Sequence, residues 1–196
     1  MKMNLPNKLT MLRIFMIPVF MVFLCVPPLW DVLPDTAIRL IAAGIFVLTA
    51  LTDMLDGKIA RKYNLITNFG KLMDPLADKM MVFGAMLGIL MYCEDLRAGF
   101  VWAAIIVIFR EMGVTSLRLV AASKAGEVIA AAWLGKVKTV TQVVCILAVL
   151  LEPVILPFPL FTEMHLLSWI TIAAMIVMTL WSGIDYFKAY AGYLKD

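Results

Sequence analysis

Four aspartates at helical spacing are the residues of this chain best suited to chemistry: Asp53, Asp56, Asp74 and Asp78. Within each pair the spacing is three or four residues, which places both carboxylates on one face of a helix. The surrounding sequence is apolar, and four unpaired carboxylates at a bilayer centre would cost on the order of 10 kcal/mol. Such a cluster requires cations. Because its ligands are oxygens without His or Cys, it predicts Mg²⁺ or Mn²⁺ in preference to zinc.

Small residues and one arginine accompany the aspartates. Gly57 and Ala60 lie on the helical stripe of the first pair and leave room for a bulky group against the backbone, and Gly70 does the same beside the second pair. Arg61 supplies a planar guanidinium suited to phosphate. The short connection 62–69 predicts two antiparallel helices that face each other and gather the four carboxylates around a common point.

A structural alternative is that the aspartates form ion pairs in a polar rim with nearby basic residues. The candidates are Lys58, Arg61, Lys71 and Lys79. The small residues between the aspartates favour a binding site instead. A second pair of small residues, Gly84 and Gly88, is typical of close helix packing.

Composition places these helices in a membrane. The chain has 196 residues, of which 63% are hydrophobic and 16% charged, against about 45–50% and about 25% in soluble domains. We therefore expect one integral membrane domain over 1–196. The net charge of +3 is spread over loops and helix ends, which argues against nucleic acid as a partner. The three cysteines show no metal-type spacing and predict no disulfide.

The predicted fold is an all-α bundle of six transmembrane helices, since a spanning helix needs about 20 apolar residues. The expected spans are about 9–30, 37–61, 71–93, 98–121, 137–156 and 164–187. Residues 1–12 are expected to form a juxtamembrane amphipathic segment on the membrane surface.

Basic residues predict the orientation. Fifteen of the 17 lie at the N-terminus, the second and fourth connections, the adjoining helix ends and the C-terminus. By the positive-inside rule these sides face the cytoplasm. We therefore expect a multi-pass protein of the cytoplasmic (plasma) membrane with both termini and the carboxylate site facing the cytoplasm.

A second group of polar residues predicts an anion pocket. It consists of Arg110, Arg118, Lys136 and Lys138. Arginine within a span is costly and indicates a role, and together the four predict a phosphorylated acceptor. The alternatives are an ion pair of Arg110 with Glu111 or an aspartate of the cluster, and basic side chains that extend to the membrane surface.

The pattern D-x2-D-G-x2-A-R-x8-G-x3-D-x3-D, from Asp53 to Asp78, resembles the signature of the CDP-alcohol phosphotransferase family at all eight positions. The six-helix layout extends this similarity over the whole chain. The resemblance implies a dimeric six-helix bundle, CDP-diacylglycerol as donor, and two divalent ions held by the four aspartates. It implies Asp78 as general base. It also implies contacts with CDP by Asp53, Asp56, Gly57, Ala60, Arg61 and Gly70.

Secondary motifs resemble the branch of the family whose acceptor is sn-glycerol 3-phosphate. They are Arg110-Glu111 with Thr115 and Leu117-Arg118, Leu134-Gly135-Lys136 with Lys138-Thr139 and Gln142, Pro6-Asn7-x-Leu9-Thr10-x2-Arg13, and Ser182-Gly183-x2-Tyr186. Asn7 and Thr10 are candidate substrate contacts, or local caps of the first helix.

Three other interpretations remain open from the sequence. The first is a relative that uses inositol phosphate, serine or phosphatidylglycerol as acceptor. The second is a membrane prenyltransferase with aspartate-rich helices. The third is a cation-coupled transporter, which is disfavoured because the carboxylates gather at one end of the spans and no inverted repeat is visible.

Overall fold

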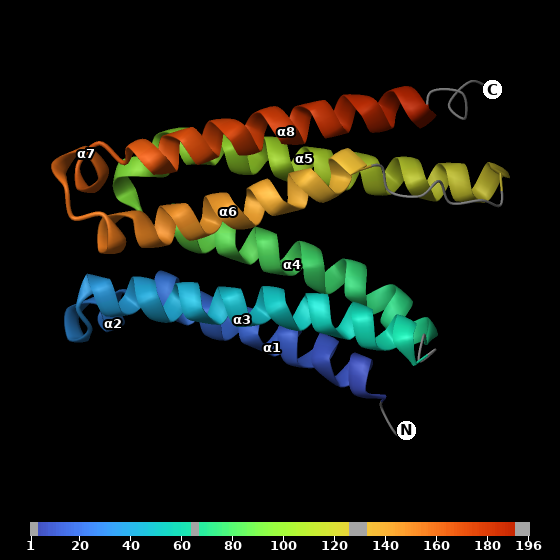
Figure 1. Cartoon of the computed structure of the whole chain (residues 1–196), viewed down its shortest axis with the longest axis horizontal. Coiled ribbons are helices and arrows are strands. Elements are labelled where there is room, and N and C mark those ends of the chain that lie inside the picture. The colour runs from blue at the N-terminus through green and yellow to red at the C-terminus, as the bar shows by residue number, and fades with distance from the viewer. Residues whose placement is uncertain (1–3, 64–66, 126–132, 191–196) are drawn as a thin grey trace.

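The computed structural model describes residues 4–63, 67–125 and 133–190, and the regular elements in these ranges are α-helices (Figure 1). They are α1 (Leu5–Cys25), α2 (Pro27–Val32), α3 (Asp35–Lys62), α4 (Asn68–Tyr92), α5 (Glu94–Ala125), α6 (Trp133–Ile155), α7 (Pro159–Thr162) and α8 (Leu166–Tyr190). The expected all-α class is confirmed.

Six of these helices are long and apolar enough to cross a membrane: α1, α3, α4, α5, α6 and α8. They correspond to the six predicted spans, with bounds that differ by a few residues. The largest difference is in α1, which runs without a break from Leu5 to Cys25. Residues 5–12 are therefore its first turns and no separate surface segment is seen there, while residues 1–3 lie outside the described ranges.

Proline and a side-chain cap explain where several helices begin and end. Proline lacks an amide hydrogen and clashes with the preceding turn, so α1 ends at Cys25 and α2 begins at Pro27. At the start of α4 the Thr67 hydroxyl accepts a hydrogen bond from the Gly70 amide at 3.0 Å. That bond satisfies one of the amides left open in a first helical turn.

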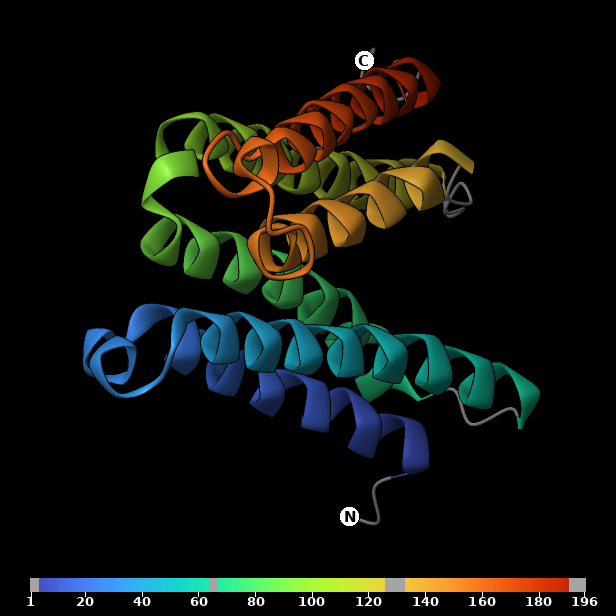
Figure 2. The ribbon, with the colours of Figure 1, turned by 60° about the vertical axis from the view of Figure 1, so that its left-hand side comes forward.

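Helix α1 lies against both α3 and α4, and these two packings are the most extensive in the part of the chain that the structure describes. Helix α4 packs against α5 and α6, and α3 also packs against α6, so both helices join α1 to the group formed by α5, α6 and α8 (Figures 1 and 2). Direct contact between α3 and α4 is limited to a short length. The expectation that these two helices simply face each other is therefore wrong, because α1 also packs against both.

Two glycines allow the close approach of α1 and α4. A Cβ atom at Gly84 would lie 2.9 Å from Ile17 Cγ2, and one at Gly88 would lie 2.9 Å from Leu24 Cδ1. Ile17 and Leu24 are buried in the main core cluster. The predicted packing role of the two glycines is confirmed, as small residues let helix backbones approach each other.

The two ends of the bundle differ. The described N- and C-terminal residues lie at one end, whereas α2 and α7 lie at the other (Figure 1). Asp53 and Asp56 are near the C-terminal end of α3, and Asp74 and Asp78 are in the first turns of α4. Because the chain reverses between these helices, all four aspartates lie at the end that carries the termini.

Candidate active site

Arg13 of α1 lies at the centre of the carboxylate cluster, with a fully buried side chain. Its Nη1 donates to Asp78 Oδ1 at 2.6 Å and lies 2.7 Å from Asp53 Oδ1. Its Nη2 donates to Asp56 Oδ2. One guanidinium therefore joins carboxylates from α3 and α4, which its planar fork of donors allows.

The fourth carboxylate is also held by α1. The Thr10 hydroxyl, one turn before Arg13, lies 2.7 Å from Asp74 Oδ1 and 3.1 Å from the Pro6 carbonyl. Helix α1 thus contacts all four aspartates through two side chains. The site has three walls, α1, α3 and α4, where the sequence predicted two.

Asn7 lies on the same face of α1 as these two side chains. Its Oδ1 accepts a hydrogen bond from the Thr67 hydroxyl at 3.0 Å, and a Cβ atom at Gly70 would lie 3.2 Å from the same oxygen. The N-cap of α1 is Asn4, whose side chain makes no cap bond. The interpretation of Asn7 and Thr10 as caps of this helix is therefore wrong.

The carboxylates of the cluster differ in their exposure to the outside of the bundle. Asp56 is 4% exposed, whereas the side chains of Asp53 and Asp78 are 40% and 52% exposed. Gly57 follows Asp56 on α3. The side chains of Ala60 and Arg61 lie outside the described residues. A molecule that reached this end of the bundle would meet Asp78 and Asp53 first.

The donor set suits a hard divalent cation. Three carboxylates from two helices already converge on one positive group, and every donor is an oxygen. As arranged here, no group of three or more His, Cys, Asp or Glu side chains among the described residues is spaced as a metal site. The guanidinium of Arg13 lies between three of the four carboxylates. The aspartates do form ion pairs, but with Arg13, which the rim alternative did not name. The side chains of Arg61 and Lys71, which it did name, lie outside the described residues.

A second polar cluster lies where α5, α6 and α8 meet. Glu111 forms ion pairs with Arg110, at 3.1 Å, and with Lys138. Arg110 Nη2 also donates to the Ser182 hydroxyl at 2.5 Å. The predicted pairing of Arg110 with Glu111 is confirmed, and Lys138, buried on α6, joins it.

Tyr186 of α8 extends this cluster to a second arginine. Arg118 Nη2 donates to the Tyr186 hydroxyl at 2.5 Å, and both Arg110 and Arg118 lie over its ring, 5.3 and 5.0 Å from the centroid. The Nε atoms of both arginines are buried and have no hydrogen-bond partner among the described residues. Buried donors without partners are costly, and an anion would satisfy them.

The two clusters lie on helices that contact each other. Helix α6, which carries Lys138, packs against α3 and α4, which carry the aspartates, and the charges of Lys138 and Asp78 interact. The structure brings together Arg110, Arg118 and Lys138. Lys136 is exposed, and none of the contacts described for this cluster includes it.

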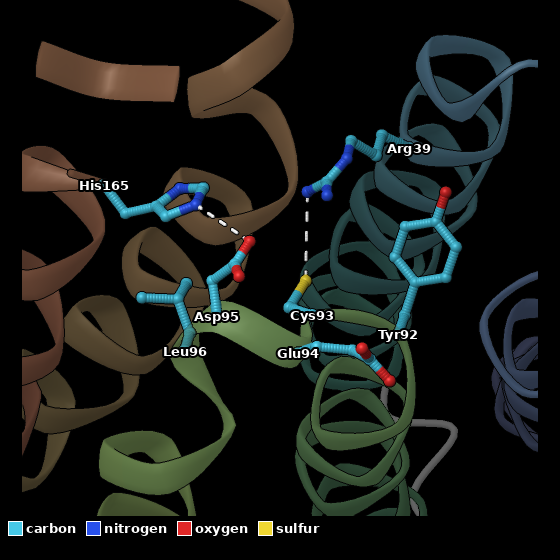
Figure 3. A pocket seen from close by; sticks show the side chains of 7 residues that line it. All are labelled: Arg39, Tyr92, Cys93, Glu94, Asp95, Leu96 and His165. Carbon is cyan, nitrogen blue, oxygen red and sulfur yellow. Dashed lines mark hydrogen bonds and ion pairs between the residues drawn. The ribbon is translucent and has the colours of Figure 1, made fainter. Parts of the chain in front are cut away.

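A polar cavity of about 210 Å³ lies at the opposite end of the bundle, where α4 meets α5 (Figure 3). Arg39 Nη1 donates to Cys93 Sγ at 3.8 Å there, and His165 Nε2 lies 3.6 Å from Asp95 Oδ2. Burial raises the pKa of the Cys93 thiol, so the thiol stays protonated. His165 is buried with φ 49°. These residues are far along the helices from the aspartates and form no part of the candidate site.

Sequence reasoning missed Arg13 as a member of the site and gave Ser182 and Tyr186 no contact in it, whereas it named Glu111 as a possible partner of Arg110. Arg13 carries a signal that was available, because a charged residue inside an apolar span by default indicates function. Its partners lie 43 and 65 residues along the chain, so spacing alone does not identify them.

Comparison with known proteins identifies the family of this chain. Residues 3–181 match the CDP-alcohol phosphatidyltransferase family. A Bacillus subtilis protein named CDP-diacylglycerol–glycerol-3-phosphate 3-phosphatidyltransferase is 43% identical over 192 residues, which cover 94% of each chain. An Escherichia coli protein of the same name is 34% identical over 199 positions that cover both chains completely. A Mycobacterium tuberculosis protein named "Probable phosphatidylglycerophosphate synthase" is 37% identical over 183 residues, 93% of this chain and 79% of its own. The chain therefore belongs to the CDP-alcohol phosphatidyltransferase family, whose members are in general divalent-metal-dependent phosphotransferases.

Proposed function

We propose that this protein transfers the phosphatidyl group of CDP-diacylglycerol to sn-glycerol 3-phosphate and so produces phosphatidylglycerophosphate and CMP. Family membership supports the donor and the class of reaction. The names of the relatives, at 34–43% identity over nearly the whole chain, support the acceptor.

The acidic and basic clusters, which lie on contacting helices, carry this proposal. Arg110 and Arg118 each present a buried Nε with no hydrogen-bond partner among the described residues, and the charges of Lys138 and Asp78 interact. Guanidinium and ammonium groups gathered in this way suit the phosphate of an acceptor. A phosphorylated alcohol held there has its hydroxyl close to the carboxylates, as transfer requires. Lys136, two residues before Lys138, would contribute from the exposed side.

The four aspartates would hold the metal, which we propose to be two Mg²⁺ or Mn²⁺ ions. When bound, these ions would draw charge from the phosphorus under attack and stabilise the departing CMP. We further propose that the donor's CDP group lies against the helix ends beside the aspartates. The residues proposed to contact it are Asp53, Asp56, Gly57, Ala60, Arg61 and Gly70.

Asp78 is proposed as the general base. The acceptor hydroxyl oxygen forms a bond to the lipid-side phosphorus, the bond from that phosphorus to CMP breaks, and CMP leaves with the electron pair. The hydroxyl proton passes to a carboxylate oxygen of Asp78. The Asp78 side chain is 52% exposed and has one oxygen that does not bind Arg13 in the contacts described, so an acceptor has access to it.

The membrane arrangement is a further part of the proposal. The basic residues at the terminal end of the bundle support a cytoplasmic location for both termini and for the site, in the plasma membrane. Large apolar side chains are exposed along the spanning helices, and they suit lipid or a second copy in a homodimer. A reporter fused to the C-terminus tests the orientation. Native mass spectrometry of the 21.9 kDa chain in detergent tests the dimer.

CMP release from CDP-diacylglycerol by the purified chain in detergent tests the reaction. We expect release only when sn-glycerol 3-phosphate and Mg²⁺ or Mn²⁺ are both present, and none with a chelator. Parallel reactions contain inositol phosphate, serine or phosphatidylglycerol as acceptor. Release with one of these and not with sn-glycerol 3-phosphate, from folded protein, contradicts the proposed acceptor. If the folded protein releases no CMP under any of these conditions, the proposal that it catalyses this class of reaction is contradicted.

A further inference from the structure

Arg13 is the one cation that touches three of the four aspartates in the part of the chain that the structure describes. We propose that Arg13 is the counter-cation of the carboxylate cluster: it holds the carboxylates together before divalent ions bind, and it competes with those ions for the same oxygens. This inference rests on the proposed function, because it requires the aspartates to be the metal site.

The contacts of Arg13 place it where a metal ion would have to bind. Its guanidinium binds Asp53 Oδ1, Asp56 Oδ2 and Asp78 Oδ1. A divalent ion takes carboxylate oxygens at about 2.0–2.6 Å, and a guanidinium between the same oxygens leaves no room for it there. Two positive groups within a few ångströms also repel each other. The ion and the guanidinium therefore exclude each other from the centre of the cluster.

Electrostatics explain why such a counter-cation is needed and why it does not close the site permanently. Like-charged carboxylates in a partly buried place repel each other, and each is costly without a partner. One guanidinium against four carboxylates still leaves three formal negative charges in the cluster. The remaining charge attracts divalent ions while Arg13 is in place.

The contacts of α1 with the cluster do not all depend on the Arg13 guanidinium. Its Nε is buried and has no hydrogen-bond partner among the described residues, so the resting arrangement is not fully satisfied. Thr10, one turn earlier, binds Asp74 separately. Helix α1 therefore keeps a contact with the cluster when the guanidinium moves off the other three carboxylates.

Mn²⁺ binding to the substrate-free, full-length protein in detergent tests the inference, with free Mn²⁺ measured by electron paramagnetic resonance. The variants are Arg13→Gln and Arg13→Lys. The matched control is Arg39→Gln, which removes a partly buried, ion-paired arginine at the other end of the bundle. If Arg13 occupies the site in most molecules, only the remaining fraction can bind Mn²⁺, and the apparent Kd rises as that fraction falls. We therefore expect the Kd for Mn²⁺ to fall by about tenfold or more in Arg13→Gln and to stay unchanged in Arg39→Gln.

Thermal unfolding gives a second readout. Without metal, Arg13→Gln is expected to unfold at a lower temperature than the wild type, because the carboxylates lose their partner. Mn²⁺ should raise its unfolding temperature by more than it raises that of the wild type. If Arg13→Gln does not accumulate, Arg13→Lys decides: lysine keeps the charge but cannot bridge three carboxylates, so its Kd for Mn²⁺ should lie below that of the wild type.

Unchanged or weaker Mn²⁺ binding by folded Arg13→Gln or Arg13→Lys, beside a wild type that binds Mn²⁺ and releases CMP, overturns the inference and leaves the proposed function intact. The same holds if Arg39→Gln changes Mn²⁺ affinity as much as Arg13→Gln does. A wild type that binds no Mn²⁺ overturns both the proposed metal site and the role of Arg13.

Discussion

At the scale of single residues, Asp78 combines exposure with a direct ion pair to Arg13. Asp78→Asn keeps the shape of the side chain and removes the base. We expect turnover to fall by about 10²–10⁴-fold, the range that general-base catalysis contributes, with little change in thermal stability. CMP release at saturating substrates measures this. Turnover like that of the wild type, in a variant that unfolds at the normal temperature, would remove Asp78 from the role of base.

Lys138 and Lys136 form a natural pair for testing the acceptor pocket. Lys138 is buried against Glu111, whereas Lys136 is exposed. Hydrogen bonds to charged groups contribute about 1.5–3 kcal/mol, so Lys138→Met should raise the KM for sn-glycerol 3-phosphate by roughly 10–100-fold. The KM for CDP-diacylglycerol should change far less. Lys136→Met is the control and should have a smaller effect. Equal effects of the two variants on both substrates would argue against a pocket at Lys138.

At the scale of elements, the seam between α1 and α4 holds two walls of the site together. Gly88→Ala places a Cβ atom 2.9 Å from Leu24 Cδ1 and 3.2 Å from Leu24 Cβ. Overpacking of this kind costs about 1–3 kcal/mol, so the variant should unfold at a lower temperature. Its turnover should also fall, since α1 carries Thr10 and Arg13. Gly44→Ala on α3 is the control: a Cβ atom there meets nothing within 4 Å.

Both glycine variants gain the same helix propensity, because each replaces a helical glycine by alanine. The difference between their unfolding temperatures therefore reports the effect of packing alone. Thermal unfolding in detergent measures that difference. If Gly88→Ala is as stable as Gly44→Ala, the two helices have room to separate and the seam does not position α1.

At the scale of the whole molecule, the two ends of the bundle have different roles. The aspartates lie at one end, which we call the chemical end, and α2 and α7 lie at the other, which we call the structural end (Figure 1). Arg39 joins three helices at the structural end: it donates to Asp35 at 2.7 Å and to the Val149 carbonyl at 3.3 Å, and it lies over the Tyr92 ring. Arg39→Gln should destabilise the protein by about 1–3 kcal/mol, because it leaves the carbonyl of the buried Val149 without this donor. The KM for both substrates should remain unchanged. A change in KM with normal stability would show that the two ends are coupled.

The sequence alone determined the features that depend on neighbours along the chain. Six apolar stretches of spanning length predict six helices, because burial of backbone polar groups in lipid requires them. Spacings of three and four residues place each aspartate pair on one helix face. Basic residues inside the spans likewise indicated Arg110 and Lys138. The pairing of Arg110 with Glu111 is confirmed, whereas its membership of an acceptor pocket stays a prediction.

Only the tertiary structure decided what lies between the aspartates. Arg13 is more than 40 residues from Asp56 and 65 from Asp78 along the chain, and no periodicity relates positions so far apart. Their contact arises because Gly84 and Gly88 let α1 pack closely on α4 while α1 also packs on α3. Which side chain then reaches the carboxylates depends on the packing of three helices at once, whereas each helix by itself is encoded locally.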